Sequence, residues 1–185
     1  MKFGLYGGSF DPVHHGHLIL AREAREQLGL ERVLFIPAAH SPHKLGMAPT
    51  PGEVRREMLG AALAEEPGFF LEECDLRRTG PSFAIETVRE LRGRWPTAEF
   101  FYLIGHDNVA KLHTWHLYEE LKRSVQFVVF GRGEHDAPHD FPTIIRRVDI
   151  SATEVRSRVA RGESIRYLVP DRVREIIARR QLYQE

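Results

Sequence analysis

The sequence predicts an α/β fold with a mainly parallel sheet flanked by helices. Short apolar runs alternate with segments of helical periodicity along the chain, as in strand–helix–strand units. The runs at 33–37, 99–104 and 125–130 are apolar at almost every position, as expected for strands buried on both faces of a parallel sheet. With 185 residues, the chain is expected to form a single domain over 1–185, with a helical C-terminal part at about 151–185.

The expected elements follow from these patterns in order. The expected strands are 2–6, 33–37, 69–71, 99–104, 125–130 and 143–148. The expected helices are 18–28, with a helical pattern that begins near His14, then 53–64, 83–92, 115–123, 150–160 and 170–182, with a helical patch at 110–112. Polar or proline-rich loops are expected at 38–51 and 134–142, and a turn at 77–82. Ser82 is expected to be the N-cap of the helix that follows it.

Composition excludes several classes of function. Basic and acidic residues balance at 26 each, so the formal net charge is +0 and no overall basic field favours nucleic acid as a partner. No apolar run approaches the length of a membrane span and no signal-peptide pattern opens the chain, so a cytoplasmic protein without a membrane partner is expected. Cys74 is the single cysteine, which excludes an internal disulfide, and its acidic neighbours disfavour a nucleophilic thiolate.

The first candidate site joins a glycine turn to a helix start. Paired glycines let the backbone approach a ligand closely, and a helix N-terminus offers N–H groups that suit phosphate. His14 and His17 lie three positions apart, so they share one face of the helix. A phosphate site comprising Gly7, Gly8, Ser9, Phe10, His14 and His17 is therefore expected, against the alternative of an ordinary turn with packed histidines. A zinc site is disfavoured because no further ligands stand at a suitable spacing.

The second candidate site is another helix start near the C-terminus. Ser151 with Glu154 three residues later forms a capping box, and Thr153 and Arg156 add a hydroxyl and a cation. Backbone N–H groups together with arginine make strong charge-assisted hydrogen bonds to phosphate. From this stretch alone, a plain helix cap with a surface arginine explains the residues equally well.

Both helix starts match known signatures. The run GGSFDPVHHGHL resembles the N-terminal signature of the nucleotidyltransferase superfamily, whose H-x-G-H core corresponds to residues 14–17. The glycines and FDP ahead of that core are most similar to bacterial nicotinate-nucleotide adenylyltransferases. The run ISATEVR resembles the second signature, I-S-S/T-T-x-I-R, although Ala152 replaces a hydroxyl residue. The resemblance implies a Rossmann-like nucleotidyltransferase fold and a triphosphate site at Ser151, Thr153 and Arg156.

Two further segments extend the resemblance on the ATP side. Pro42-His43-Lys44 matches the P-H-K of the family and implies that Lys44 contacts phosphate, whereas the residues alone allow a solvated loop lysine. The run YLIGHDNVAKLHTWHLYEEL is similar to the (I/L)-G-x-D…L-x-x-W segment of the family. This similarity implies that Gly105 and Asp107 belong to the ATP site, with Asp107 at the ribose.

The same resemblance implies a site for a pyridine nucleotide. Trp115 is expected to stack on the pyridine ring with His116 beside it, and the alternative is that Trp115 anchors the core. A metal held by His113 and His116 is disfavoured because no third ligand is evident. Ser82 and Phe83 fall in the segment that the family writes P-S-Y-T-x-D-T, where Phe83 and Ala84 lack two hydroxyls. The preference for nicotinate over nicotinamide is therefore left open.

The resemblance implies transfer of the adenylyl group of ATP to nicotinate mononucleotide, with release of pyrophosphate, by direct in-line attack. His14 and His17 would be the catalytic donors to the phosphates, most effective when protonated, and Mg²⁺ would come with the ATP phosphates rather than on protein ligands. A phosphopantetheine adenylyltransferase and a non-catalytic nucleotide-binding module remain as alternatives. The sequence is compatible with a homo-oligomer and does not determine one.

Overall fold

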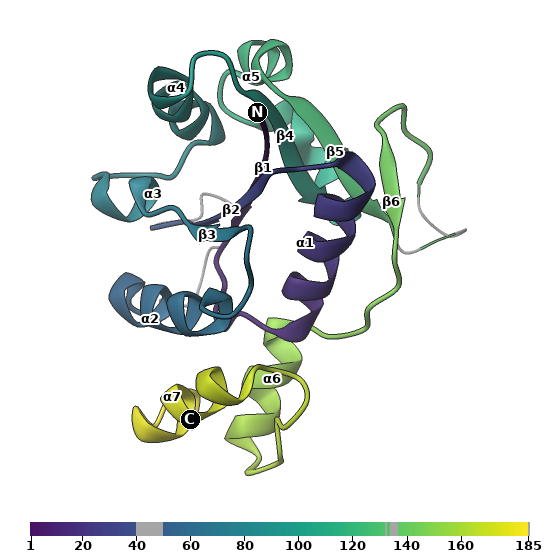
Figure 1. Ribbon diagram of the computed structural model, residues 1–185. Helices are drawn as coiled ribbons and strands as arrows, with labels where there is room; N and C mark the ends of the chain where they lie inside the picture. Colours follow the sequence, from purple (N-terminus) through teal and green to yellow (C-terminus); the bar gives the residue numbers. More distant parts are fainter. Residues whose placement is uncertain (40–49, 132, 134–136, 185) are drawn as a thin grey trace.

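One parallel sheet forms the centre of the molecule. The computed structural model describes residues 1–39, 50–131, 133 and 137–184. Within these residues, six strands are ordered β3-β2-β1-β4-β5-β6 and every neighbouring pair is parallel (Figure 1). The strands are β1 (Lys2–Gly8), β2 (Arg32–Pro37), β3 (Phe69–Leu71), β4 (Glu99–Gly105), β5 (Gln126–Gly131) and β6 (Thr143–Ile145). The predicted α/β fold with a parallel sheet is confirmed.

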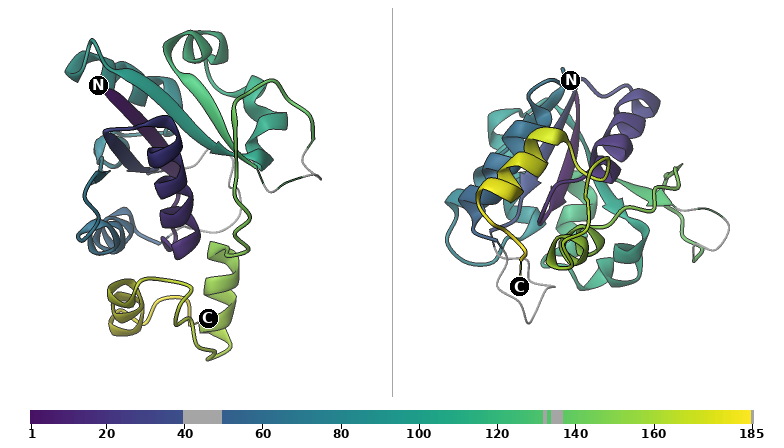
Figure 2. Two further views of the ribbon diagram at one scale, coloured as in Figure 1. Left: turned by 45° about the vertical axis from the view of Figure 1, so that its right-hand side comes forward. Right: turned by 90° about the horizontal axis from the view of Figure 1, so that it is seen from below.

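Four helices share one apolar cluster with the first face of the sheet. They are α1 (His15–Leu28), α2 (Gly52–Leu63), α6 (Ala152–Ala160) and α7 (Asp171–Arg179). Ala21, Met58 and Val173 of these helices are fully buried in one cluster with Phe35 and Val128 of the sheet. In two views α7 lies beside α2, and α6 and α7 lie at the end of the molecule where α1 begins (Figure 1, Figure 2). The C-terminal helices therefore close the region beyond the carboxyl end of β1.

A second group of helices covers the opposite face. It consists of α3 (Cys74–Arg77), α4 (Ala84–Arg94), the 3₁₀ helix η1 (His106–Thr114) and α5 (Tyr118–Ser124). Ile85, Leu112 and Leu121 share a buried cluster with Leu5 and Tyr102 of the central strands. Because both faces are covered, β1, β4 and β5 read as almost continuous apolar runs in the sequence.

Several element boundaries differ from the prediction. Strand β1 ends at Gly8 rather than 6, so the paired glycines belong to the strand and not to a turn. The short helix α3 was not predicted, and the helical patch at 110–112 is part of the longer 3₁₀ helix η1. Helix α5 begins at Tyr118 rather than 115, strand β6 ends at Ile145 rather than 148, and α7 ends at Arg179 rather than 182. Most of the expected loop at 38–51 lies outside the described residues.

The fold places its central glycines where open α/β sheets bind ligands. The chain leaves β1 toward β2 and β3 on one side and continues through β4, β5 and β6 on the other, so the strand order reverses between β1 and β4. Ligands bind outside the carboxyl ends of strands at such a point.

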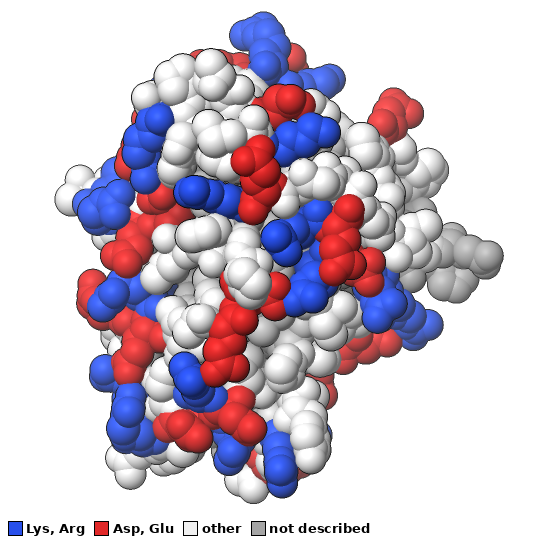
Figure 3. All heavy atoms as spheres, in the orientation of Figure 1, with Lys and Arg blue, Asp and Glu red and all other residues white. Residues whose placement is uncertain are grey.

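Acidic and basic side chains are interspersed on the face shown in Figure 3. Among the described residues, no helix has the length and apolar character needed to cross a membrane.

Candidate active site

A cavity of about 840 Å³ opens at the carboxyl ends of β1 and β4. All the candidate site residues that the structure describes line it, namely Gly7, Gly8, Ser9, Phe10, His14, His17, Ser82, Phe83, Gly105, Asp107, Trp115, His116, Ser151, Thr153 and Arg156. Lys44 lies outside the described residues. The structure thus brings together motifs that are far apart in the sequence, while the role of each residue stays a prediction.

The two histidines at the start of α1 are arranged unequally. Their rings stack with centroids 3.7 Å apart. The backbone N–H of His14 donates to Nδ1 of His17 at 3.2 Å. Because Nδ1 of His17 accepts this hydrogen bond, the proton of the neutral ring is on Nε2. Nε2 is therefore the ring nitrogen of His17 that can donate to a ligand.

His14 is buried and neutral at pH 7. The residue is only 6% exposed, and burial, followed by the nearby charge of His15, lowers its pKa to about 4. Its Nδ1 has no hydrogen-bond partner among the described residues. The packed environment thus disfavours the charged ring of His14 in the ligand-free protein. That both imidazoles act most effectively on the phosphates when protonated stays a prediction.

Two glycines of the site lie close to the ends of neighbouring side chains. A Cβ on Gly7 would lie 2.9 Å from the hydroxyl of Tyr102, which is closer than van der Waals contact permits. A Cβ on Gly105 would lie 2.5 Å from Oδ1 of Asp107.

Phe10 is buried, and its ring meets that of His17 edge-on at a centroid distance of 5.0 Å. Phe10 therefore packs against the histidine and supports its ring.

The start of α6 meets the start of α1. Ser151 caps α6 as predicted, because its Oγ accepts the N–H of Glu154 at 3.1 Å. Arg156 donates through Nη1 to the backbone oxygen of Asp11 at 2.7 Å and through Nη2 to Oγ1 of Thr153 at 3.3 Å. These bonds hold the Arg156 guanidinium beside the turn that leads into α1. Two helix N-termini and a cation thus border one side of the cavity.

Aromatic side chains border the other side of the cavity. The rings of Phe83 and His116 lie 4.4 Å apart, and Trp115 meets Tyr102 edge-on at a centroid distance of 5.8 Å. Trp115 is half-buried and lines the cavity, so it both packs against the core and faces a ligand site.

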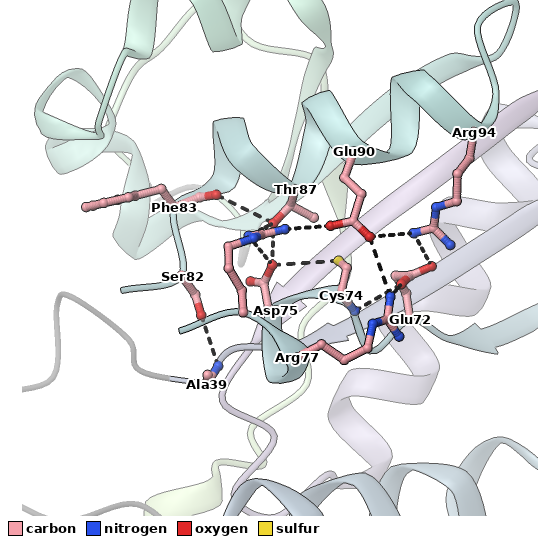
Figure 4. A network of polar contacts seen from close by, with 11 residues as sticks. Ala39, Glu72, Cys74, Asp75, Arg77, Ser82, Phe83, Thr87, Glu90 and Arg94 are labelled. Atoms are coloured by element: carbon pink, nitrogen blue, oxygen red, sulfur yellow. Dashed lines mark hydrogen bonds and ion pairs between the residues drawn. The ribbon is translucent and has the colours of Figure 1, made fainter. Parts of the chain in front are cut away.

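The predicted N-cap role of Ser82 is wrong. Phe83 is the N-cap of α4, and Oγ of Ser82 instead accepts the N–H of Ala39 at 2.9 Å (Figure 4).

A polar network that sequence reasoning missed lies beneath this aromatic side. The buried Asp75 lines the cavity, accepts hydrogen bonds from Thr87 and from Nη1 of Arg78, and links α3 to the first turn of α4 (Figure 4). Burial is the largest cause that raises the pKa of Asp75, and its hydrogen bonds oppose that shift. In the sequence, the only indication of this network was an acidic residue, Asp75, shortly after a strand.

The same network contains a group that could be mistaken for a metal site. Among the described residues, Glu72, Cys74 and Glu90 bring three donor atoms within 4.8 Å of one another. Arg94 lies 2.7 Å from Glu72, and Arg77 is 3.6 Å from Glu72 and 3.5 Å from Glu90. Burial and the surrounding carboxylates raise the pKa of the Cys74 thiol. The group is an ion-pair network, and its arginines already balance the carboxylates (Figure 4).

Comparison with known proteins identifies the family of the chain and its relatives. The family model described as cytidylyltransferase-like matches residues 5–158. The chain belongs to the cytidylyltransferase-like family. It is 41% identical over 192 residues to a protein of Exiguobacterium sibiricum named "Probable nicotinate-nucleotide adenylyltransferase", with 99% of both chains covered. It is 42% identical over 188 residues to a Thermus thermophilus protein of the same name, with both chains fully covered. The resemblance to the nicotinate-nucleotide adenylyltransferases is thereby confirmed.

Solved structures show the same fold at lower identity. A Plasmodium falciparum nicotinic acid mononucleotide adenylyltransferase complexed with NaAD has a TM-score of 0.80 and 16% identity, and the match covers 98% of this chain and 97% of that one. The same enzyme complexed with APC has a TM-score of 0.78. The Rossmann-like nucleotidyltransferase fold inferred from the sequence motifs is therefore confirmed.

Proposed function

We propose that the chain transfers the adenylyl group of ATP to nicotinate mononucleotide, forming nicotinate adenine dinucleotide and pyrophosphate in NAD biosynthesis. The observation that carries this proposal is the two-sided cavity. Two helix N-termini, the glycine end of β1 and Arg156 border one side, and Phe83, Trp115 and His116 border the other. A polyphosphate suits the first side and a planar ring suits the second. Membership of the family and the names of the relatives support the same activity.

The reaction needs positioning more than acid–base chemistry. The nucleophile is a phosphate oxygen that is already ionised at neutral pH, so no general base is required. Holding two anions in line contributes about 7–11 kcal/mol through orientation. His17 supplies a preset N–H donor at the start of α1, where negative charge develops on the phosphates during transfer. His14 packs against His17 and keeps its ring in place.

The remaining ATP contacts are assigned from the lining of the cavity. Gly7, Gly8 and Ser9 provide the end of β1 over which the phosphates lie, and Ser151, Thr153 and Arg156 bind the outer phosphates. Lys44 would add a cation from the segment 40–49. Gly105 and Asp107 lie at the end of β4, where they suit the ribose.

Mg²⁺ enters as part of the MgATP substrate. The described carboxylates that line the cavity are Asp75 and Asp107, and Asp75 is already held by Arg78 and Thr87. Such a set does not form a protein cage for the ion. Mg²⁺ keeps several waters and binds substrate phosphates at sites of this type. We therefore assign the ion to the ATP phosphates.

The pyridine nucleotide occupies the aromatic side. Trp115 offers its face to the ring, and Phe83 and His116 form a second aromatic pair at the same border. Ser82 is positioned by its hydrogen bond to Ala39.

The location of the enzyme in the cytoplasm, its single-domain organisation and a homo-oligomeric state stay predictions.

One parallel assay separates the proposed activity from its alternatives. Pyrophosphate release from MgATP is measured with nicotinate mononucleotide, nicotinamide mononucleotide or phosphopantetheine as the second substrate. We expect the highest kcat/KM with nicotinate mononucleotide. Release only with phosphopantetheine would assign the other adenylyltransferase activity. ATP binding without release in any arm would assign a nucleotide-binding module.

A further inference from the structure

Arg55 is a buried cation with an unusual set of partners. It lies in the first turn of α2 and is only 1% exposed. Its Nε donates to the backbone oxygen of Thr50 at 2.8 Å, its Nη1 to that of Ser9 at 2.8 Å, and its Nη2 to that of Ala39 at 3.4 Å. Among the described residues no carboxylate pairs with it at ion-pair distance. A fully buried guanidinium is therefore committed to three backbone carbonyls.

One of the three carbonyls belongs to a residue that lines the cavity, and a second follows such a residue. Ser9 lines the cavity directly after β1, and Ala39 follows the lining residue Ala38. Ala39 and Thr50 flank the segment 40–49 on either side. One planar group thus fixes the spacing between Ser9 and both flanking residues. Only arginine presents several donors in such a rigid fork, because lysine offers a single compact charge.

The N–H groups of the same two flanking residues point to opposite sides of the site. The N–H of Ala39 donates to Oγ of Ser82, on the aromatic side (Figure 4). The N–H of Thr50 donates to Oδ2 of Asp11 at 3.1 Å, on the phosphate side. Each flanking residue therefore connects Arg55, through its own backbone, to a different side of the cavity.

The phosphate side of this arrangement is itself well braced. Oδ1 of Asp11 accepts the hydroxyl of Tyr183 at 2.6 Å, and the backbone oxygen of Asp11 accepts Arg156 at 2.7 Å. Asp11 thereby joins the turn before α1 to α6 and to the C-terminal residues. A displacement of Thr50 would reach Arg156 through Asp11, whose carboxylate accepts the Thr50 N–H and whose backbone oxygen accepts Arg156.

We propose that Arg55 is a positioning residue that couples the phosphate side of the cavity to the aromatic side. It does not line the cavity, so it acts through Ser9, Ala39 and Thr50. The inference rests on the proposed function, since both substrates must be held at once for transfer. It predicts that a change at Arg55 alters the use of both substrates, although its side chain touches neither.

The test compares Arg55→Lys with Arg56→Lys. Arg56 is the next residue of the same helix, is partly exposed, and pairs with Glu53 and Glu73. In Arg55→Lys we expect kcat to fall at least tenfold and the KM values for both substrates to rise at least threefold. Arg56→Lys should remain within twofold of wild type. Circular dichroism and urea unfolding establish that each variant is folded. A folded Arg55→Lys variant with wild-type kcat and KM values would overturn the proposal.

A second variant keeps the proposal testable if Arg55→Lys does not fold. Ser82→Ala removes the acceptor of the Ala39 N–H and leaves the core intact. Coupling predicts that Ser82→Ala raises the KM for ATP at least threefold, although Ser82 lies on the aromatic side. An unchanged KM for ATP would contradict the coupling. If both variants fold, the fold-decrease in activity of the double variant should be smaller than the product of the fold-decreases of the two single variants.

Failure of the proposed function is recognised separately. If wild-type protein releases no pyrophosphate with any second substrate, the proposed activity is wrong whatever the variants do. MgATP binding, measured by calorimetry, then still tests Arg55. Affinity in Arg55→Lys should fall at least threefold and affinity in Arg56→Lys should not. Equal affinities would overturn the positioning role.

Discussion

The buried neutral state of His14 predicts a specific loss of stability in acid. An imidazole in the unfolded chain takes up a proton as the pH falls below 6.5, whereas in the folded protein burial lowers the pKa of His14 to about 4. Protonation therefore favours the unfolded state between these two values and has no effect above the upper one. The full difference corresponds to about 3 kcal/mol, of which about 2 kcal/mol is lost by pH 5.

The assay is urea unfolding of wild type and His14→Asn at pH 7.5 and pH 5.0. The variant is less stable at both pH values because packing is lost, so the quantity compared is the change in unfolding free energy between them. Wild type should lose about 2 kcal/mol more than His14→Asn over this interval. His113→Asn, which changes an exposed histidine of η1, is the matched control and should follow wild type. Equal losses in wild type and His14→Asn would refute the reasoning.

Three further predictions concern catalysis and bracing. His17→Ala should lower kcat for pyrophosphate release by about 10²–10³ in a variant that circular dichroism shows to be folded, because it removes a preset donor. A near wild-type kcat would contradict that role. Gly105→Ala should raise the KM for ATP, because its Cβ would lie 2.5 Å from Oδ1 of Asp107 and displace it; an unchanged KM would show that Asp107 does not contact ATP. Tyr183→Phe should lower the unfolding free energy by about 1 kcal/mol through loss of the hydrogen bond to Asp11, as measured by urea unfolding, and unchanged stability would show that the bond contributes nothing.

The parts of the site that are continuous in sequence could be predicted from local chemistry. The paired glycines, the helix start and the spacing of His14 and His17 all fall within residues 7–17, where strand and helix patterns follow one another, although the glycines end the strand rather than form a turn. Ser151 was predicted as a cap for the same reason, since the pattern needs only Glu154 three residues later. In each case the physics acts over a few residues, so a single sequence contains the signal.

Contacts between residues far apart in the chain could not be predicted in this way, because no local sequence pattern indicates them. The bond between Tyr183 and Asp11 spans 172 residues, and that between Arg55 and Ser9 spans 46. Arg55 reads in the sequence as one of many helical arginines, because nothing nearby shows that its side chain is buried. Ser82 looked like a helix cap because its residue type favours that role, but the loop end at Ala39 competes for its oxygen.

The histidine pair shows how the fold separates two residues that the motif presents as equivalent. His14 is at the N-cap of α1, where the surrounding core excludes water and keeps its ring uncharged. Its backbone N–H, in turn, occupies Nδ1 of His17 and places the proton of that ring on Nε2. The orientation and tautomer of the donor are therefore set by the helix start itself, before any substrate binds. Such preorganisation is what transfer between phosphates requires, since donors that are already aligned need no rearrangement as charge develops. The changes at His14 and His17 should accordingly separate, with the pH dependence of stability following the first and turnover following the second.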